Sequence, residues 1–255
     1  TYLYQHVIEE SEKYPLKNFI VLVPEQFTMQ TQKDLVSMHP RHGIMNIDVL
    51  SFARLAYRVF EETGTKQMQV LDDEGKNLIL RKIAGDYENK LTVLKGNIKK
   101  LGYISEVKSV ISEFTQYDIG EEEMDEMLDH LDEDSRLYYK LKDIRLLYEG
   151  FQDYLRERYI TKEELLDVLN SQVKESELLK NSVVVLDGFT GFTPVQNRLI
   201  LELMRCCKEV WVTVTMDERE NPYAYKHPYQ LFGLSKQMVT TLVRMAGEDH
   251  LEVEE

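Results

Sequence analysis

Short, uninterrupted apolar runs rich in branched residues lie near both ends of this chain, and they constrain its fold more than any other feature. There are four of them, at residues 19–23, 45–50, 183–186 and 210–215. A continuous run of this length is typical of a strand buried on both faces of a parallel sheet. Segments with helical apolar spacing separate the members of each pair, at residues 28–38, 51–62 and 194–207. This alternation predicts an α/β fold with a parallel sheet flanked by helices.

The middle of the chain follows a different pattern. Between residues 64 and 182 the strand signal is absent, and five segments have helical spacing: 72–87, 103–117, 121–130, 135–159 and 161–173. The sequence Thr161-Lys-Glu-Glu164 has the form of a capping box that starts a helix. We therefore expect a discontinuous α/β core, residues 1–63 and 183–255, interrupted by an all-helical insertion over 64–182.

Composition excludes several classes of protein. The formal net charge of −14 means that the chain as a whole does not attract nucleic acid or an anionic membrane, so any DNA contact requires a local patch or stacking. No apolar run approaches the ~20 residues of a membrane-spanning helix. The two cysteines, Cys206 and Cys207, are adjacent and suit neither a disulfide framework nor a metal knuckle, which favours a reducing cytoplasm.

Two charged stretches are interpreted as solvated surface. The acidic runs 121–126 and 132–134 are typical of exposed helix faces rather than of a metal site or a DNA-mimicking surface. A looser basic stretch is interpreted in the same way, as a surface face. Its members are Lys76, Arg81, Lys82, Lys90, Lys95, Lys99 and Lys100.

The segment 183–196 carries the strongest chemical signal. Four apolar residues followed by Asp187 have the form of a Walker B motif, in which the carboxylate helps to hold Mg²⁺ beside nucleotide phosphates. In helicases resembling UvrD, the positions after that Asp include Phe, Pro and Gln, and here Phe189, Pro194 and Gln196 fall in register. The general-base Glu of those helicases is replaced by Gly188. Loss of a positioned base typically costs ~10²–10⁴ in rate, so we expect slow or absent ATP hydrolysis.

Three motifs together strongly resemble the AddB family, whose members each form one half of an AddAB helicase–nuclease. They are residues 22–30, residues 49–57, and residues 186–189 followed by 192–194, and their order and separation also match. The resemblance implies a P-loop NTPase-like, superfamily 1 helicase-like fold. It also implies a heterodimer with an AddA-type motor, double-strand break repair by homologous recombination, and scanning of single-stranded DNA for the Chi regulatory sequence. Members of the family carry a 4Fe–4S cluster in their C-terminal nuclease domain.

Carried over residue by residue, the resemblance implies six DNA-binding residues: Gln26, Thr28, Phe52, Arg54, Tyr57 and Phe189. Their chemistry suits the role, because Arg, Gln and Thr can hydrogen-bond bases or phosphates and aromatic rings stack on bases. All six follow the carboxyl ends of predicted strands. Alternatives remain open: Phe52 and Tyr57 as helix residues facing the sheet, Arg54 as a surface charge, and Thr28 as a helix N-cap.

The resemblance also sets the expected cofactors. ATP and Mg²⁺ belong to the parent protein, with Asp187 as the Mg²⁺ ligand and Asp187 with Gln196 at the degenerate nucleotide site. The family's phosphate-binding loop is expected immediately before Thr1, and the nuclease and cluster residues far beyond Glu255, so this chain alone is expected to be inert. Two other functions stay open. One is an active DNA-dependent ATPase with Asp217 or Glu218 as the base, and the other is a protein–protein scaffold for the motor subunit.

Overall fold

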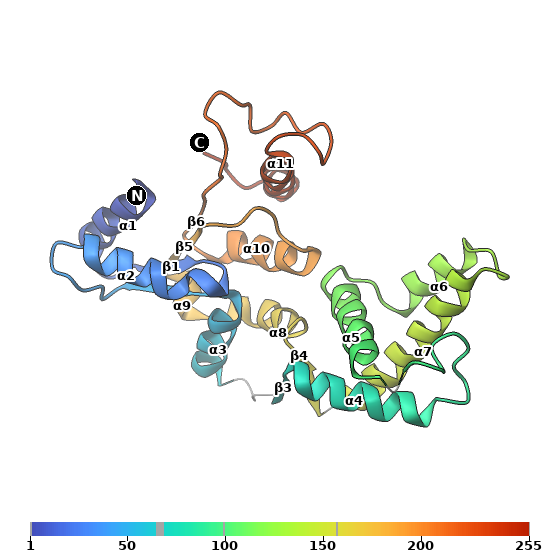
Figure 1. Cartoon of the computed structure of the whole chain (residues 1–255). Helices are drawn as coiled ribbons and strands as arrows, with labels where there is room; N and C mark the ends of the chain where they lie inside the picture. Colours follow the sequence, from blue (N-terminus) through green and yellow to red (C-terminus); the bar gives the residue numbers. More distant parts are fainter. Residues whose placement is uncertain (1, 65–68, 99, 157, 255) are drawn as a thin grey trace. The chain divides into compact units, whose positions relative to one another are not determined.

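The computed structural model describes residues 2–64, 69–98, 100–156 and 158–254 (Figure 1). The chain separates into two units. Unit 1 comprises Thr1–Lys66 and Leu166–Glu255, and unit 2 comprises Gln67–Leu165. Residues 166–182, which the sequence pattern groups with the insertion, belong to unit 1 in this division.

Unit 1 is built on a four-stranded parallel sheet. Its strands are β1 (Asn18–Leu22), β2 (Ile47–Leu50), β5 (Ser182–Leu186) and β6 (Glu209–Val212), in the order β2-β1-β5-β6. Every neighbouring pair is parallel, with Leu22 in register with Leu50 on one side and with Leu186 on the other. The structure thus confirms the predicted α/β class and the parallel sheet flanked by helices.

The helices of unit 1 begin and end close to the predicted positions. They are α1 (Tyr2–Lys13), the 3-10 helix η1 (Glu25–Phe27), α2 (Thr28–Met38), α3 (Phe52–Thr63), η2 (Val173–Glu175), α9 (Glu177–Lys180), α10 (Pro194–Cys206) and α11 (Gly233–Glu248), while α8 (Leu165–Gln172) starts at the unit boundary. Local chemistry sets the ends of α3: the Ser51 hydroxyl accepts from Arg54 N, and Gly64 at φ 66° provides the left-handed C-cap.

The sheet is buried on both faces, which explains why its strands are continuously apolar. Side chains from α1 and α2, among them Val7 and Leu35, pack with Phe19 and Val21 on one face. Ile20, the alternate residue of the same strand, is also fully buried and points to the other face. A strand with no solvated face has no polar positions, so it carries no alternating pattern.

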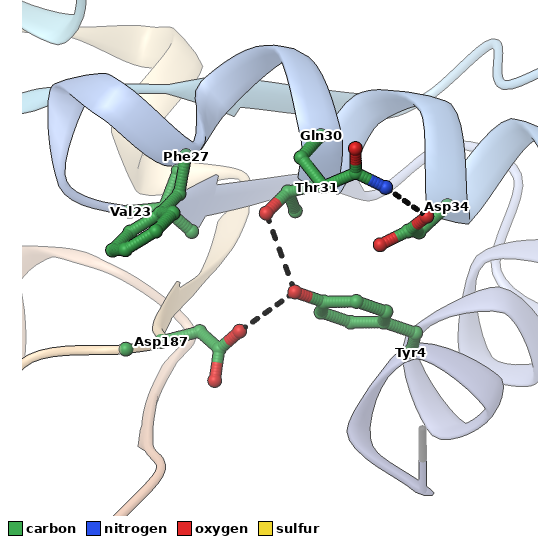
Figure 2. A pocket seen from close by; sticks show the side chains of 8 residues that line it. Tyr4, Val23, Phe27, Gln30, Thr31, Asp34 and Asp187 are labelled. Carbon is green, nitrogen blue, oxygen red and sulfur yellow. Dashed lines mark hydrogen bonds between the residues drawn. The ribbon is translucent and has the colours of Figure 1, made fainter.

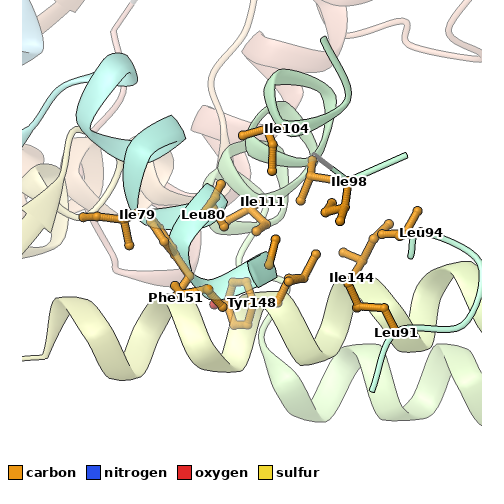
Figure 3. Packing of buried hydrophobic residues seen from close by; sticks show 14 of the residues in the cluster. Ile79, Leu80, Leu91, Leu94, Ile98, Ile104, Ile111, Ile144, Tyr148 and Phe151 are labelled. Atoms are coloured by element: carbon orange, nitrogen blue, oxygen red, sulfur yellow. The ribbon is translucent and has the colours of Figure 1, made fainter. Parts of the chain in front are cut away.

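Unit 2 consists mainly of four helices, α4 (Asp73–Asp86), α5 (Leu101–Gln116), α6 (Glu121–Asp129) and α7 (Arg136–Leu155). Its apolar core gathers Leu80 of α4, Ile111 of α5, Met124 of α6 and Phe151 of α7, all nearly inaccessible to solvent (Figure 3). Among the described residues of the chain, no helix is long and apolar enough to cross a membrane.

The expectation of an all-helical insertion is wrong in one respect. Unit 2 also contains a two-stranded parallel sheet, β3 (Gln69–Leu71) and β4 (Tyr159–Thr161). Each strand has only three residues and its partner is about ninety residues away, so neither produces a periodic signal in the sequence. The expected capping bonds between Thr161 and Glu164 do form in both directions, but helix α8 begins only at Leu165.

Candidate functional site

The carboxyl edge of the sheet in unit 1 gathers the polar residues that the sequence singles out. Because the four strands are parallel, the segments that follow them meet at one edge, where open α/β sheets bind their ligands. Gln26 follows β1, Arg54 follows β2, and Asp187 follows β5. Thr213 follows β6, and its backbone N–H donates to Leu186 O at 2.9 Å.

The Asp187 carboxylate is the centre of a hydroxyl cluster (Figure 2). The Tyr4 hydroxyl donates to Oδ2 at 2.8 Å, and the Thr213 hydroxyl donates to Oδ1 at 2.6 Å. Tyr4 Oη also lies 3.3 Å from Thr31 Oγ1 on α2. Burial raises the pKa of Tyr4, with Thr31 opposing and Asp187 reinforcing that rise, so the phenol stays protonated as a donor.

A pocket of about 180 Å³ lies beside this cluster. Its lining includes two carboxylates, Asp187 and Asp34, and Asp34 accepts a hydrogen bond of 2.7 Å from Gln30 (Figure 2). The other lining residues are Tyr4, Val23, Phe27, Thr31 and Gly188, so none of the lining residues is Lys or Arg. Pockets for small-molecule ligands usually enclose ~300–1,000 Å³.

These residues do not by themselves fit ATP and Mg²⁺. Both oxygens of Asp187 already accept hydroxyl groups, and no cation of the lining is available for phosphate. Among the described residues, no group of three or more His, Cys, Asp or Glu side chains is placed to hold a metal ion. A nucleotide at this edge would therefore need binding groups from outside this pocket, and no catalytic step is derived through it.

Gly188, at the position of the missing general base, has a left-handed backbone with φ 77°. A Cβ there would lie 3.7 Å from Pro24 Cδ, which is ordinary contact, so space does not exclude a side chain. The conformation does disfavour one, because L-residues in the left-handed region cost roughly 1–2 kcal/mol. The backbone and the sequence difference therefore agree.

Gln196 is committed to helix capping. Its Oε1 accepts from Thr193 N at 3.0 Å, and its own N–H donates to Thr193 Oγ1 at 3.3 Å. This reciprocal pair is a capping box at the start of α10. The Thr-x-x-Gln spacing is a capping signal that the sequence itself displays, and Gln196 does not line the pocket beside Asp187.

The aromatic candidates divide into packed and exposed rings. Phe52 is buried and packs 5.5 Å from Phe189 and 6.4 Å from Phe192, between ring centroids. Phe189 and Phe192 are themselves 5.1 Å apart, so the three rings form one cluster at the sheet edge. Sequence reasoning did not predict a site role for Phe192. Tyr57, one turn further along α3, is 40% exposed.

The polar candidates divide in the same way. Gln26 is exposed, whereas Thr28 is buried and donates its hydroxyl to Glu25 O at 3.0 Å. The N-cap of α2 is Phe27, so Thr28 is the first helical residue and not the cap. Arg54 is exposed, with Nε 3.5 Å from Glu25 Oε1 in a solvated ion pair. Gln26, Arg54 and Tyr57 are thus the three candidates most open to solvent.

The alternative general bases do not have the properties of a base. Both carboxylate oxygens of Asp217 accept hydrogen bonds from the Arg219 side chain, at 2.9 and 2.7 Å. This pairing lowers the pKa of Asp217. Glu218 is exposed, and neither residue lines the pocket beside Asp187.

An open parallel sheet whose carboxyl edge carries a polar cluster, a small pocket and exposed contact residues defines an α/β ligand-binding domain. The comparisons identify its family. The whole chain, residues 1–255, matches the family model described as "ADDB, N-terminal". The chain therefore belongs to the AddB N-terminal family, as its motifs predicted.

Similar proteins are named as one and the same subunit of an "ATP-dependent helicase/deoxyribonuclease". One from Lachnoclostridium phytofermentans is 46% identical over 98% of this chain and 22% of its own length. One from Alkaliphilus oremlandii is 39% identical over 77% of this chain and 17% of its own. One from Clostridium kluyveri is 35% identical over 92% and 20%. The chain spans about a fifth of the length of these relatives.

Proposed function

We propose that this chain is the helicase-like, single-stranded DNA-contacting domain of an AddB-type protein in an ATP-dependent helicase/deoxyribonuclease. The observation that carries the proposal is the joint exposure of Gln26, Arg54 and Tyr57 on segments that follow neighbouring parallel strands. The names of the relatives support the wider role in a helicase–nuclease.

The chemistry of the three residues suits a DNA strand laid along the sheet edge. Arg54 is held only by a solvated ion pair with Glu25, which contributes ~0–1 kcal/mol, so a phosphate or a guanine can replace that partner. Tyr57 offers an exposed ring for stacking, which is worth ~1–3 kcal/mol per base. Gln26 can hydrogen-bond base edges, and this combination supports the reading of a regulatory sequence such as Chi.

Two further candidates have supporting rather than direct roles in this proposal. Phe52 is buried against Phe189, so these rings shape the edge and set the position of the start of α3. Thr28 is buried and ties α2 to η1 through Glu25 O. Replacement of either residue would therefore disturb DNA binding through the fold of the edge.

We further propose that the fold is P-loop NTPase-like with a degenerate nucleotide site. Gly188 supplies no base, and the Asp187 carboxylate is engaged by Tyr4 and Thr213. In the complete helicase–nuclease, a partner motor of the AddA type would supply ATP-driven movement for double-strand break repair. The nuclease activity and the 4Fe–4S cluster would belong to other parts of the longer protein, because a cluster needs about four thiolates.

Photo-crosslinking tests the proposal. In the helicase–nuclease that contains this chain, 5-bromouracil-substituted single-stranded DNA is expected to crosslink to peptides that contain Gln26 and Tyr57. Substitution of Tyr57 by Leu should remove the crosslink at that position and leave the others. Crosslinks confined to peptides of the opposite sheet edge, such as the one that contains Arg41, would contradict the proposed contact surface.

A further inference from the structure

Unit 2 carries an ordered row of cations and aromatic rings outside the sheet edge. Lys82 Nζ lies 5.0 Å from the centroid of the Tyr154 ring, and Arg158 Cζ lies 5.5 Å from the same centroid. Lys90 Nζ lies 5.0 Å from the centroid of Tyr87. Cation–aromatic contacts at this distance hold otherwise mobile side chains in place.

The two sets of contacts lie on one seam between α4 and α7. A Cβ added at Gly150 would be 2.7 Å from Tyr87 Cε2, so the Tyr87 ring rests directly on α7 at that glycine. Tyr154 is four residues further along α7, one helical turn, and therefore lies on the same side of the helix. We name this row, Lys82, Tyr87, Lys90, Tyr154 and Arg158, the cation ridge.

A buried carboxylate fixes the loop next to the cation ridge. Asp143 on α7 is 2% exposed and accepts hydrogen bonds from the backbone N–H groups of Thr92, Val93 and Leu94, at 2.8–3.1 Å. This anchor holds the segment that follows Lys90 against α7. The ridge is therefore built on ordered backbone rather than on a free loop.

The cations of the ridge are free to bind anions. Lys82, Lys90 and Arg158 are exposed, and none of them forms an ion pair with a residue that the structure describes. The nearby carboxylate of Asp153 is paired with Arg156 at 3.2 Å and so is already neutralised. In a chain of net charge −14, three unpaired cations on one seam stand out as a local positive site. The basic stretch found in the sequence thus has an ordered part, while Lys99 lies outside the described residues.

We propose that the cation ridge is a second nucleic-acid site, which binds the phosphate backbone without reading sequence. The lysines and the arginine already lie against the tyrosine rings, so the rings position charge rather than stack on bases. Contacts to phosphate give affinity and orientation but carry no sequence information. This site lies on the other unit from Gln26, Arg54 and Tyr57, so it stands or falls independently of the proposed function.

The test is DNA binding by the 255-residue chain, measured as fluorescence anisotropy of labelled single-stranded and duplex oligonucleotides across salt concentration. The variant K82Q/R158Q should bind every sequence more weakly, and its log-affinity against log-salt slope should be shallower by about two. The control R136Q/K140Q makes the same charge change at two exposed cations of α7 outside the ridge and should leave the slope unchanged. The charge-retaining K82R/R158K should retain binding.

Three results would overturn the inference. The first is no binding of either oligonucleotide by the parent chain at about 50 mM salt. The second is an equal loss in K82Q/R158Q and R136Q/K140Q, which would indicate only a general charge effect. The third is binding of polyglutamate, but not of DNA, that K82Q/R158Q abolishes, which would assign the ridge to an acidic protein. Arg54→Ala should not alter the part of the slope that K82Q/R158Q removes.

Discussion

The Tyr4 hydroxyl donates a 2.8 Å hydrogen bond to Asp187, which joins the first helix to the end of β5 across 183 residues of sequence. With Thr213 donating to the other oxygen, the carboxylate at the Walker B-like position connects α1, β5 and the segment after β6. In this chain the aspartate has a structural role that its sequence motif does not reveal.

Removal of that hydroxyl should destabilise unit 1. Tyr4→Phe keeps the ring but takes one donor from the Asp187 carboxylate, and a hydrogen bond to a charged group is worth ~1.5–3 kcal/mol. We expect a loss of unfolding free energy in that range from urea denaturation. Tyr14→Phe, which alters another tyrosine close to the end of α1, is the control and should change stability little. Equal stability of both variants would contradict the structural role of Tyr4.

A buried ion pair should make unit 2 sensitive to acid. Lys76, 2% exposed, donates to Glu163 at 2.7 Å. Burial alone would raise the pKa of Glu163, but the hydrogen bond and charge of Lys76 lower it below its ordinary 4.5. Because the folded-state pKa is the lower one, the stabilisation is complete above about pH 4.5 and is lost as the pH falls through the folded-state value.

Glu163→Gln should therefore cost about 3–5 kcal/mol at pH 7, because it leaves a buried lysine without a counter-ion. It should also remove part of the acid dependence of unfolding. Asp73→Asn provides the control, since its 3.2 Å pair with Lys108 involves a carboxylate that is 61% exposed and should contribute less than about 1 kcal/mol. Chemical denaturation across pH checks both, and equal costs for the two variants would contradict this account.

The two cysteines should be poor nucleophiles in the folded chain. Burial, reinforced by Cys206, raises the pKa of Cys207 to about 12. At pH 8 its thiolate fraction is then about 10⁻⁴, and the alkylation rate should rise about tenfold per pH unit towards pH 12. Mass spectrometry of iodoacetamide labelling in a Cys206→Ser background should find Cys207 protected until urea unfolds the chain. Rapid labelling of the native chain would contradict its burial.

A restored glutamate at position 188 should not create an ATPase. Gly188→Glu places a side chain on a backbone at φ 77°, which costs about 1–2 kcal/mol, beside an aspartate held by two hydroxyls. We expect no DNA-stimulated phosphate release and a measurable loss of stability. Gly191→Glu, where open space surrounds the glycine, should be tolerated. Robust turnover by Gly188→Glu would show that the missing base alone disables the site.

The sequence predicted the strands and most helices because these elements carry their own signals. Buried parallel strands such as β1 and β5 are unbroken apolar runs, and the helix α2 occurs at the bounds that its apolar spacing predicts. The strands β3 and β4 escaped detection because three-residue segments have no period and their pairing is set by tertiary structure.

Site residues were harder to predict, because exposure depends on packing that spacing does not encode. Phe52 and Tyr57 lie five positions apart on one helix, yet one is buried in an aromatic cluster and the other is open. Gln196 matched a helicase motif and a capping box equally well, and the structure uses its oxygen as a cap. The Tyr4–Asp187 bond joins residues too distant in sequence for any local pattern to predict.

The most direct test of the central claim compares two arginines on opposite edges of the sheet. Arg54 lies at the carboxyl edge, whereas Arg41, also exposed, lies in the turn between α2 and β2 at the other edge. The measurement is the affinity of the assembled helicase–nuclease for single-stranded DNA with and without the regulatory sequence. Arg54→Ala should weaken or relax recognition by about 1–3 kcal/mol while Arg41→Ala has no effect. Equal affinities and equal selectivity in the two variants would contradict the assignment of the carboxyl edge as the DNA-reading surface.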